Sequence, residues 1–360
     1  MLSSLLALIA LLSASGAHAF EVAYNVPGGS EFQGIAVSGP NLLVADTVDG
    51  DRFESDAGIV SVYDRATGLL RGTLPNPDGD GGFGRSLTAN DRWTAVSALG
   101  GVHVFDNRGE FVRSFRSDAP EHYDFGLQVA LSADRLLVSD DWTPASVHVF
   151  DVTTGAVVQT LPRPDGIPKG YNPYDPYTAL AVAGDLAIVS SPMAGVVCAL
   201  DITTSIERWC VSSPRRQGND FFGSAMSVDG DDLIVGAPGP PYAFAEPHQT
   251  PGNAYLLDAE TGSVRRRYKG LTPGSAFGTA VAVKGNRILV GAPNPAAKAT
   301  RSGKAYLLAK SSGRILHTFR SPRNKFDIRT GAAVAFIASR IAVVDLWDDS
   351  EKSPVIRVFR

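Results

Sequence analysis

The sequence is poor in charge, in cysteine and in several motifs that would point directly to a function. Only 19% of the 360 residues are charged, the net charge is −4, and there are two cysteines. A chain without excess positive charge has no general attraction for nucleic acid. No Asn-x-Ser/Thr motif, nucleotide-binding glycine loop or Ser-His-Asp phrase is present, so N-glycosylation, nucleotide binding and triad catalysis are not expected.

Long apolar runs are also missing after the N-terminus. Residues 5–19 (LLALIALLSASGAHA) form a short apolar stretch that ends in Ala17-His18-Ala19. This pattern is typical of a cleaved export signal and is too short to span a membrane, although no early Lys or Arg precedes it. We therefore expect a signal peptide at 1–19 and a secreted or periplasmic mature chain, 20–360, with no membrane span.

What the chain does contain is a repeated phrase. Residues 222–238 (FGSAMSVDGDDLIVGAP) and 277–293 (FGTAVAVKGNRILVGAP) are close copies. Weaker copies align on the valine that ends the second apolar run of each, about 50 residues apart. The seven alignment points are Val44, Val96, Val138, Val189, Val235, Val290 and Val343.

Each copy contains four strand-length apolar segments. The third and fourth are joined by phrases such as DRATG (64–68) and DAETG (258–262), whose Asp and Gly suit a tight turn. The second segments lack alternation, as strands buried on both faces do. This pattern predicts an all-β fold, a single seven-bladed β-propeller with four-stranded antiparallel blades.

The ends of the chain provide a second prediction. Residues 355–360 match a third strand, and the seventh copy has no fourth strand after them. Residues 20–27 (FEVAYNVP) resemble the fourth strands of other copies. We therefore expect 20–27 to pair beside 355–360 and to close the ring.

The repeats resemble a known family. Phe222-Gly223 and Phe277-Gly278, with Gly-Ala-Pro at 236–238 and 291–293, are similar to the FG-GAP repeat of integrin α-subunits and many secreted bacterial proteins. The resemblance implies a seven-bladed propeller that binds proteins or glycans, and some members form part of enzymes. The calcium loop common in integrins has no counterpart here, because the connections at 227–233 and 282–288 are tight. No cofactor is therefore expected.

One acidic segment keeps a calcium interpretation open. Residues 46–56 (DTVDGDRFESD) offer Asp49, Asp51 and Asp56 as weak candidate ligands, but their spacing matches no EF-hand. A solvated acidic loop explains the segment better. The phrase DGDGG (78–82) is likewise interpreted as a turn.

Binding is expected at one end of the propeller. The connections between second and third strands and between fourth and first strands emerge at the same end, here called the top, and these segments are long and varied. The third and seventh copies both have Asp-x-Trp at equivalent positions, after the second apolar segment. A carboxylate beside aromatic faces suits a sugar ligand. The candidate ligand-binding residues are Asp46, Asp140, Trp142, Tyr171, Tyr174, Tyr177, Tyr242, Asp345 and Trp347. Turn capping by Asp and packing by Trp is the alternative for each residue.

Two functions remain open. The first is a non-catalytic exported propeller that binds an extracellular glycan or protein through its top loops. The alternative is a lyase-like propeller enzyme acting on a polysaccharide, with His122 and Tyr123 as candidate bases. His103 and His148 occupy equivalent third-strand positions that hold other residue types elsewhere, so we interpret them as packing residues.

The two cysteines lie in the fourth copy, Cys198 on its third strand and Cys210 on its fourth. If Leu200 lies opposite Glu207, Cys198 faces Trp209 or its neighbour, and a shift of one residue places the cysteines face to face. An exported chain meets an oxidising compartment. We expect a Cys198–Cys210 disulfide, with two buried thiols on opposite faces as the alternative.

Overall fold

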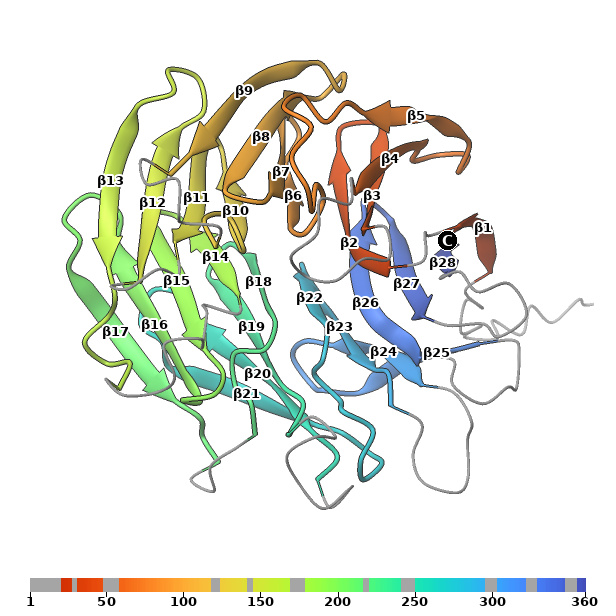
Figure 1. Cartoon of the computed structure of the whole chain (residues 1–360). Helices are drawn as coiled ribbons and strands as arrows, with labels where there is room; N and C mark the ends of the chain where they lie inside the picture. Colours follow the sequence, from red (N-terminus) through yellow and green to blue (C-terminus); the bar gives the residue numbers. More distant parts are fainter. Residues whose placement is uncertain are drawn as a thin grey trace, which may run out of the picture.

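A ring of β-sheets forms the molecule. The computed structural model describes residues 21–27, 31–47, 58–117, 124–140, 145–168, 179–215, 220–240, 250–294, 303–321, 329–346 and 355–360. Their regular structure is entirely β, in seven four-stranded antiparallel sheets that follow one another around a centre (Figure 1). Over these ranges there is no helix that is long and apolar enough to cross a membrane. The expected all-β seven-bladed propeller is confirmed.

The strands of the first four blades, from first to fourth within each blade, have the following bounds. Blades 1 and 2 contain β2 (Glu31–Ser38), β3 (Asn41–Thr47), β4 (Ile59–Asp64), β5 (Leu70–Leu74), β6 (Leu87–Ala89), β7 (Trp93–Ala98), β8 (Gly101–Asp106) and β9 (Phe111–Arg116). Blades 3 and 4 contain β10 (Val129–Ser132), β11 (Arg135–Asp140), β12 (Ser146–Asp151), β13 (Val157–Pro162), β14 (Leu180–Ala183), β15 (Leu186–Ser191), β16 (Val196–Asp201) and β17 (Glu207–Ser212).

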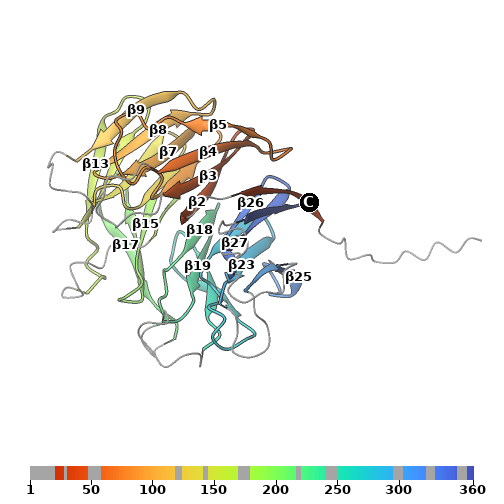
Figure 2. The same ribbon diagram turned by 45° about the vertical axis from the view of Figure 1, so that its right-hand side comes forward.

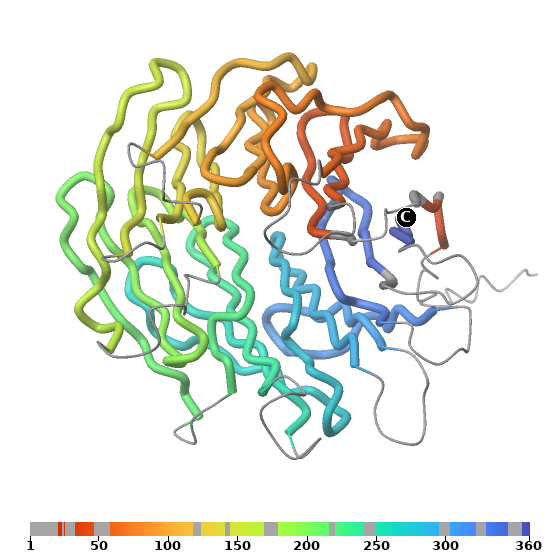
Figure 3. The backbone as a smooth tube through the Cα atoms, in the orientation of Figure 1, coloured from red at the N-terminus to blue at the C-terminus, as the bar shows by residue number. Residues whose placement is uncertain are grey.

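The remaining blades follow the same plan. Blades 5 and 6 contain β18 (Met226–Asp229), β19 (Asp232–Ala237), β20 (Asn253–Asp258), β21 (Val264–Lys269), β22 (Val281–Lys284), β23 (Arg287–Ala292), β24 (Lys304–Ala309) and β25 (Ile315–Arg320). Blade 7 contains β26 (Arg329–Ile337), β27 (Arg340–Leu346), β28 (Val355–Phe359) and, from the other end of the chain, β1 (Val22–Pro27). The tube in Figure 3 follows the chain once around this ring.

The seven reference valines of the sequence repeat mark one row of residues across each blade. All seven are fully buried. Each valine pairs with the third-strand position that varies between blades, here called the slot, and the slot pairs with one residue of the fourth strand. The slot pairs are Ser61–Thr73, His103–Ser114, His148–Thr160, Cys198–Cys210, Tyr255–Arg267, Tyr306–Thr318 and Arg357–Asn25. The sequence repeat therefore has a single structural register.

The core lies between the blades. Seven clusters of buried apolar residues occur in the described ranges, and each joins two neighbouring blades. The cluster with Val44 and Leu42 of blade 1 also contains Val344 and Ile356 of blade 7, so the first and last blades share a core. Apolar side chains on both faces of the second strands explain why their sequences do not alternate.

Glycine is needed in the repeat phrase because neighbouring blades approach closely there. Within blade 6, the N–H of Gly278 in Phe-Gly donates to the carbonyl of Gly291 in Gly-Ala-Pro (2.9 Å). Within blade 5, the N–H of Gly223 donates to the carbonyl of Gly236 in the same way. A Cβ on Gly236 would lie 2.0 Å from the Gly278 carbonyl oxygen of the next blade. A Cβ on Gly291 would lie 1.9 Å from that of Gly331. The repeat phrase therefore encodes blade-to-blade contact.

The pairing between third and fourth strands contains a β-bulge in every blade, including blade 7, where the two strands come from opposite ends of the chain. In blade 4, Leu200 pairs with Glu207 and Ala199 with Trp209, which leaves Arg208 as the extra residue. The same shift occurs in the other six sheets. Such bulges increase the local twist of the outer strand, as a propeller blade requires.

An aspartate organises the turn between the third and fourth strands in blades 1 to 5, whereas blade 6 has Ala309 at that position. In blade 1, Asp64 Oδ1 accepts from the N–H groups of Ala66 and Thr67 (both 2.8 Å), and Asp64 forms an ion pair with Arg71, the bulged residue. The Thr67 N–H, with Arg71 next, holds the pKa of Asp64 at about 2. Gly68 closes the turn with φ +75°.

The N-terminal strand pairs with the C-terminal one. β1 is antiparallel to β28, from Val22 opposite Phe359 to Pro27 opposite Val355. The dark-red β1 lies beside the dark-blue end of the chain in Figure 1, and Figure 2 shows the same neighbourhood from the side. The expected pairing is present. That β1 is what keeps the ring closed remains a prediction.

Candidate functional site

The two ends of the propeller differ in the length of their connections. At the end opposite the top, the strands are joined by two to five residues, such as 230–231 between β18 and β19 and 259–263 between β20 and β21. At the top, the longest connections are residues 163–179, between β13 and β14, and residues 238–252, between β19 and β20. Between the strands that the structure describes, the top therefore has far longer connections than the other end, and they can form a variable surface.

Most of the site residues that the sequence predicts at the top lie outside the described ranges. This holds for the aromatic candidates Trp142, Tyr171, Tyr174, Tyr177, Tyr242 and Trp347, for His122 and Tyr123, and for Asp49, Asp51 and Asp56. Their proposed roles in binding, catalysis and calcium coordination remain predictions.

The three aspartates predicted to bind a ligand occupy equivalent positions on the second strands of their blades. Asp46, Asp140 and Asp345 lie near the top ends of β3, β11 and β27, and they pair with Ile59, Ser146 and Val355. Asp140 is buried, and its Oδ2 lies 3.5 Å from Nε2 of His148. This carboxylate therefore faces its own blade and is less accessible to a ligand than the sequence suggested.

A polar cluster at the top of blade 2 was not identified as a site from the sequence. Asp78 and Asp80, in the loop between β5 and β6, both accept from Nη2 of Arg116 on β9 (2.7 and 2.6 Å). Their carboxylates also lie near His103 on β8, which is completely buried. The DGDGG phrase does form a turn, with positive φ at Gly79 and Gly82, but its two carboxylates converge on the slot residue of the blade.

The hydrogen bonds of this cluster determine the state of His103. Arg116 lowers the pKa of Asp78, so this carboxylate is ionised and acts only as an acceptor. Ser114 Oγ therefore donates to Asp78 Oδ2 (3.1 Å), and its lone pair accepts from Nδ1–H of His103 (2.9 Å). Burial lowers the pKa of His103, so the ring is neutral and Nε2 carries a lone pair.

The slot of blade 3 provides a comparison. His148 occupies the same row, but hydroxyl groups contact both of its ring nitrogens. Thr160 Oγ1 lies 3.2 Å from Nδ1, and Ser146 Oγ lies 3.3 Å from Nε2. In blade 2, Nε2 of His103 makes no hydrogen bond with any part of the chain that the structure describes. The two histidines are thus alike in position and different in chemistry.

The disulfide of blade 4 occupies the same row. Cys198 pairs directly with Cys210, their Cα atoms are 4.1 Å apart, and the structure contains the bond between them. Leu200 does lie opposite Glu207, and the bulge at Arg208 supplies the shift of one residue that brings the cysteines together. Gly166 of the preceding top loop packs against Cys210, and its N–H donates to Glu207 (3.0 Å).

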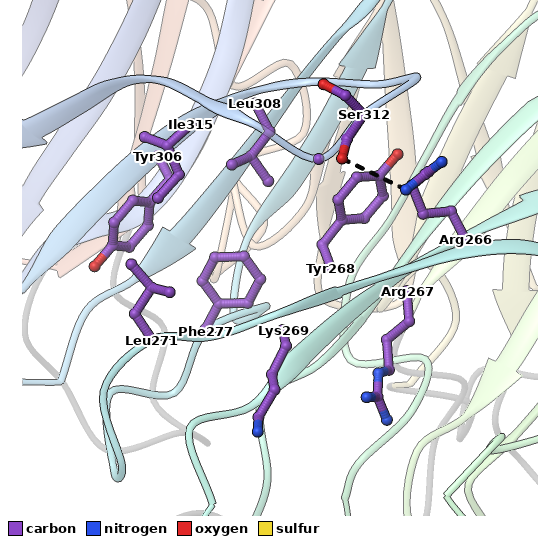
Figure 4. A pocket seen from close by; sticks show the side chains of 11 residues that line it. Arg266, Arg267, Tyr268, Lys269, Leu271, Phe277, Tyr306, Leu308, Ser312 and Ile315 are labelled. Atoms are coloured by element: carbon purple, nitrogen blue, oxygen red, sulfur yellow. Dashed lines mark hydrogen bonds between the residues drawn. The ribbon is translucent and has the colours of Figure 1, made fainter.

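A pocket of about 190 Å³ lies on the outer side of the ring, between β21 of blade 5 and blade 6 (Figure 4). Phe277, Tyr306 and Leu308 provide apolar walls, and Arg266 reaches across to the Ser312 carbonyl (3.5 Å). Tyr268 donates to the Lys310 carbonyl (2.6 Å). Burial raises the pKa of Tyr268 to about 12, so its hydroxyl stays a donor.

These contacts also explain the basic segment RRRYK (265–269), which makes up most of β21. The outer strand of a blade repeatedly bonds the turn of the next one: Arg113 donates to the Thr153 carbonyl (2.7 Å), and Trp209 to that of Ala259 (3.1 Å). Arg266 and Tyr268 also bond the turn of the next blade, while the side chain of Arg267 extends in the opposite direction to that of Arg266 (Figure 4). This segment therefore joins blade 5 to blade 6.

Comparison with known proteins supports this architecture. Residues 272–308, which include β22, β23 and most of β24, match the FG-GAP repeat family. The match covers one repeat, and the seven sheets extend the same four-stranded plan around the ring. The chain is an FG-GAP-like seven-bladed β-propeller. A search of curated proteins found no match.

Solved structures with the same overall shape confirm the fold of this FG-GAP-like propeller. The WD40 domain of Neurospora crassa Pan2 has a TM-score of 0.63 at 13% identity, covering 94% of this chain and 95% of that one. The designed protein Ika8 has a TM-score of 0.57 at 16% identity, with coverages of 93% and 99%. BamB from Moraxella catarrhalis has a TM-score of 0.50 at 17% identity, with coverages of 91% and 85%. At these identities the likeness concerns the fold alone.

Proposed function

We propose that this propeller is an exported, non-catalytic protein that binds an extracellular glycan or protein through its top loops. The observation that carries the proposal is the difference between its two ends. One end consists of short, repeated turns, and the other contains every long connection of the ring. Function in β-proteins is concentrated in loops that a rigid scaffold positions.

The binding chemistry is proposed for the aromatic and acidic residues of those loops. Trp142 and Trp347 follow equivalent strands, two positions after Asp140 and Asp345. An indole face stacks on the C–H groups of a sugar, and a carboxylate accepts from its hydroxyl groups. Aromatic anchors are also the commonest source of binding energy for protein ligands.

A screen on a glycan array, with the mature chain and two single variants, tests this proposal. Trp142→Ala and Trp347→Ala are each expected to weaken binding about fivefold, which corresponds to roughly 1 kcal/mol. Glu260→Ala, in a turn at the opposite end, is the matched control and should bind like the parent chain. Unchanged affinity in both tryptophan variants, with an unchanged melting temperature, would exclude these residues from the site.

The same screen separates binding from catalysis. Each glycan hit is incubated with the protein, and new reducing ends and unsaturated products are measured. A constant amount of intact glycan supports a binding protein. Product release that is lost in His122→Gln would instead establish the polysaccharide lyase alternative.

A further inference from the structure

In blade 2 a buried ring nitrogen faces a carboxylate. Nε2 of His103 lies 3.3 Å from Oδ2 of Asp80. His103 is fully buried, and Nε2 has no hydrogen bond within the described ranges. Such an arrangement is unfavourable unless a cation lies between the two groups.

The geometry discriminates between a proton and a metal ion. A proton shared by Nε2 and the carboxylate requires a nearly linear hydrogen bond, and the contact does not have that geometry. Two ligands of one tetrahedral metal ion instead converge on a point outside the line that joins them. With metal–ligand distances of 2.0–2.2 Å, they lie about 3.4 Å apart. The distance of 3.3 Å between Nε2 of His103 and Oδ2 of Asp80 is close to this value.

The surrounding groups suit metal binding as well. Nδ1–H of His103 donates to Ser114, which in turn donates to Asp78. A hydrogen-bonded partner on the second ring nitrogen orients a metal-binding histidine and fixes its tautomer. The other cluster of potential ligands in the described residues, Cys198, Glu207 and Cys210, is unsuitable because its sulfur atoms form the disulfide.

Arg116 acts as the competing cation. Its guanidinium contacts both carboxylates, but its side chain is 43% exposed and can turn into solvent. We propose that Asp80 and His103, with Asp78 beside them, bind a divalent transition-metal ion such as Zn²⁺ in exchange for Arg116. Asp78 and Asp80 lie in one of the top connections, but the metal site uses none of the aromatic residues proposed to bind the ligand.

Titration calorimetry of the EDTA-treated mature chain with ZnCl₂ at pH 7 tests the site. One ion is expected per chain. Asp80→Asn and His103→Gln should each abolish binding, and Asp78→Asn should weaken it tenfold to a hundredfold, as loss of an orienting partner does. Arg116→Gln should bind Zn²⁺ more tightly, because it removes the competing charge.

The matched control is His148→Gln in blade 3, whose ring nitrogens already have hydroxyl partners; its affinity for Zn²⁺ should equal that of the parent chain. If His103→Gln fails to fold by circular dichroism, Asp80→Asn, which leaves the buried ring in place, decides the question. Three results would each overturn the proposal: no Zn²⁺ bound to the parent chain, binding retained in Asp80→Asn, or Ca²⁺ bound in preference to Zn²⁺.

Discussion

Blades 5 and 6 keep the whole repeat phrase, whereas blades 4 and 7 lack its Phe-Gly. In the first pair, Phe222 packs on Tyr255 and Phe277 on Tyr306, with ring centroids 5.5 and 5.6 Å apart. In blade 4 the slot holds a disulfide, and in blade 7 it holds Arg357, whose guanidinium donates to the Arg320 carbonyl of blade 6 (2.7 Å). In blades 4 and 7, another interaction therefore occupies the row where Phe-Gly is lost.

The comparison extends to the other blades. Phe83 packs on His103 and Phe125 on His148, at 5.8 and 5.7 Å. Blade 1, without Phe-Gly, has the small Ser61 in its slot. A phenylalanine therefore occurs in the phrase where the slot of the same blade holds a ring, because the two side chains fill one space between them.

The largest effect is expected from removing β1. Unlike the other six blades, blade 7 takes its fourth strand from the opposite end of the chain. A mature chain that begins at Gly29 should lose cooperative unfolding, or more than about 4 kcal/mol of stability, because β28 becomes an unpaired edge. Thermal and urea unfolding measure this loss.

A permuted chain serves as the control for that truncation. It begins at Gly29 and has residues 20–27 joined after Arg360 by a short turn, as in the other blades. Recovery of stability in this chain supports closure by β1. A truncated chain as stable as the parent would show that the shared core of blades 7 and 1 is sufficient to hold the ring.

Gly291→Ala is the next most damaging change and tests the regular blades. Its Cβ would lie 1.9 Å from a backbone oxygen of blade 7, which cannot move without displacing a strand. We expect a loss of roughly 3 kcal/mol or more from the free energy of unfolding. Gly34→Ala is the control, because no atom lies within 4 Å of the added methyl group and the effect should be small. Equal effects in the two variants would contradict the close-contact explanation.

Blade 4 is tested by removing its disulfide. Cys198 and Cys210 are 12 positions apart, so the closed loop is short, and Cys198→Ala/Cys210→Ala should lose about 3 kcal/mol at most. Urea unfolding with and without reductant measures the difference. The reductant should affect the parent and leave the double variant unchanged. Two titratable thiols in the denatured, unreduced parent would show that the bond does not form.

The smallest effect is expected in the turn of the same blade. Ser205 has φ +60° where other turns place glycine, a conformation that costs a residue with a side chain about 1 kcal/mol. Ser205→Gly should therefore raise stability by up to ~1 kcal/mol. The reverse change in blade 6, Gly313→Ser at φ +74°, should lower it by a similar amount. A destabilised Ser205→Gly would show that the hydroxyl group matters more than the backbone strain.

Much of the fold was predictable because it depends on local patterns. Four strand-length apolar segments per copy, turns with Asp and Gly, and a repeat of about 50 residues led to seven four-stranded blades, and the chosen valines proved to be one buried row. The bulge at Arg208 was not predictable from the turn phrase, because it results from the twist of the outer strand. That shift of one residue decided between a disulfide and two separated thiols.

The sequence by itself determined the number of blades, the pairing of β1 with β28 and the end of the ring where long loops gather. Each of these follows from local strand and turn patterns or from the repetition of a four-strand unit. Only the tertiary structure decided the chemistry of the slots. Asp78 and Asp80 come from the loop that enters blade 2, while His103 and Arg116 come from its outer hairpin. No sequence period links these segments, and their electrostatic coupling arises because the blade buries them together.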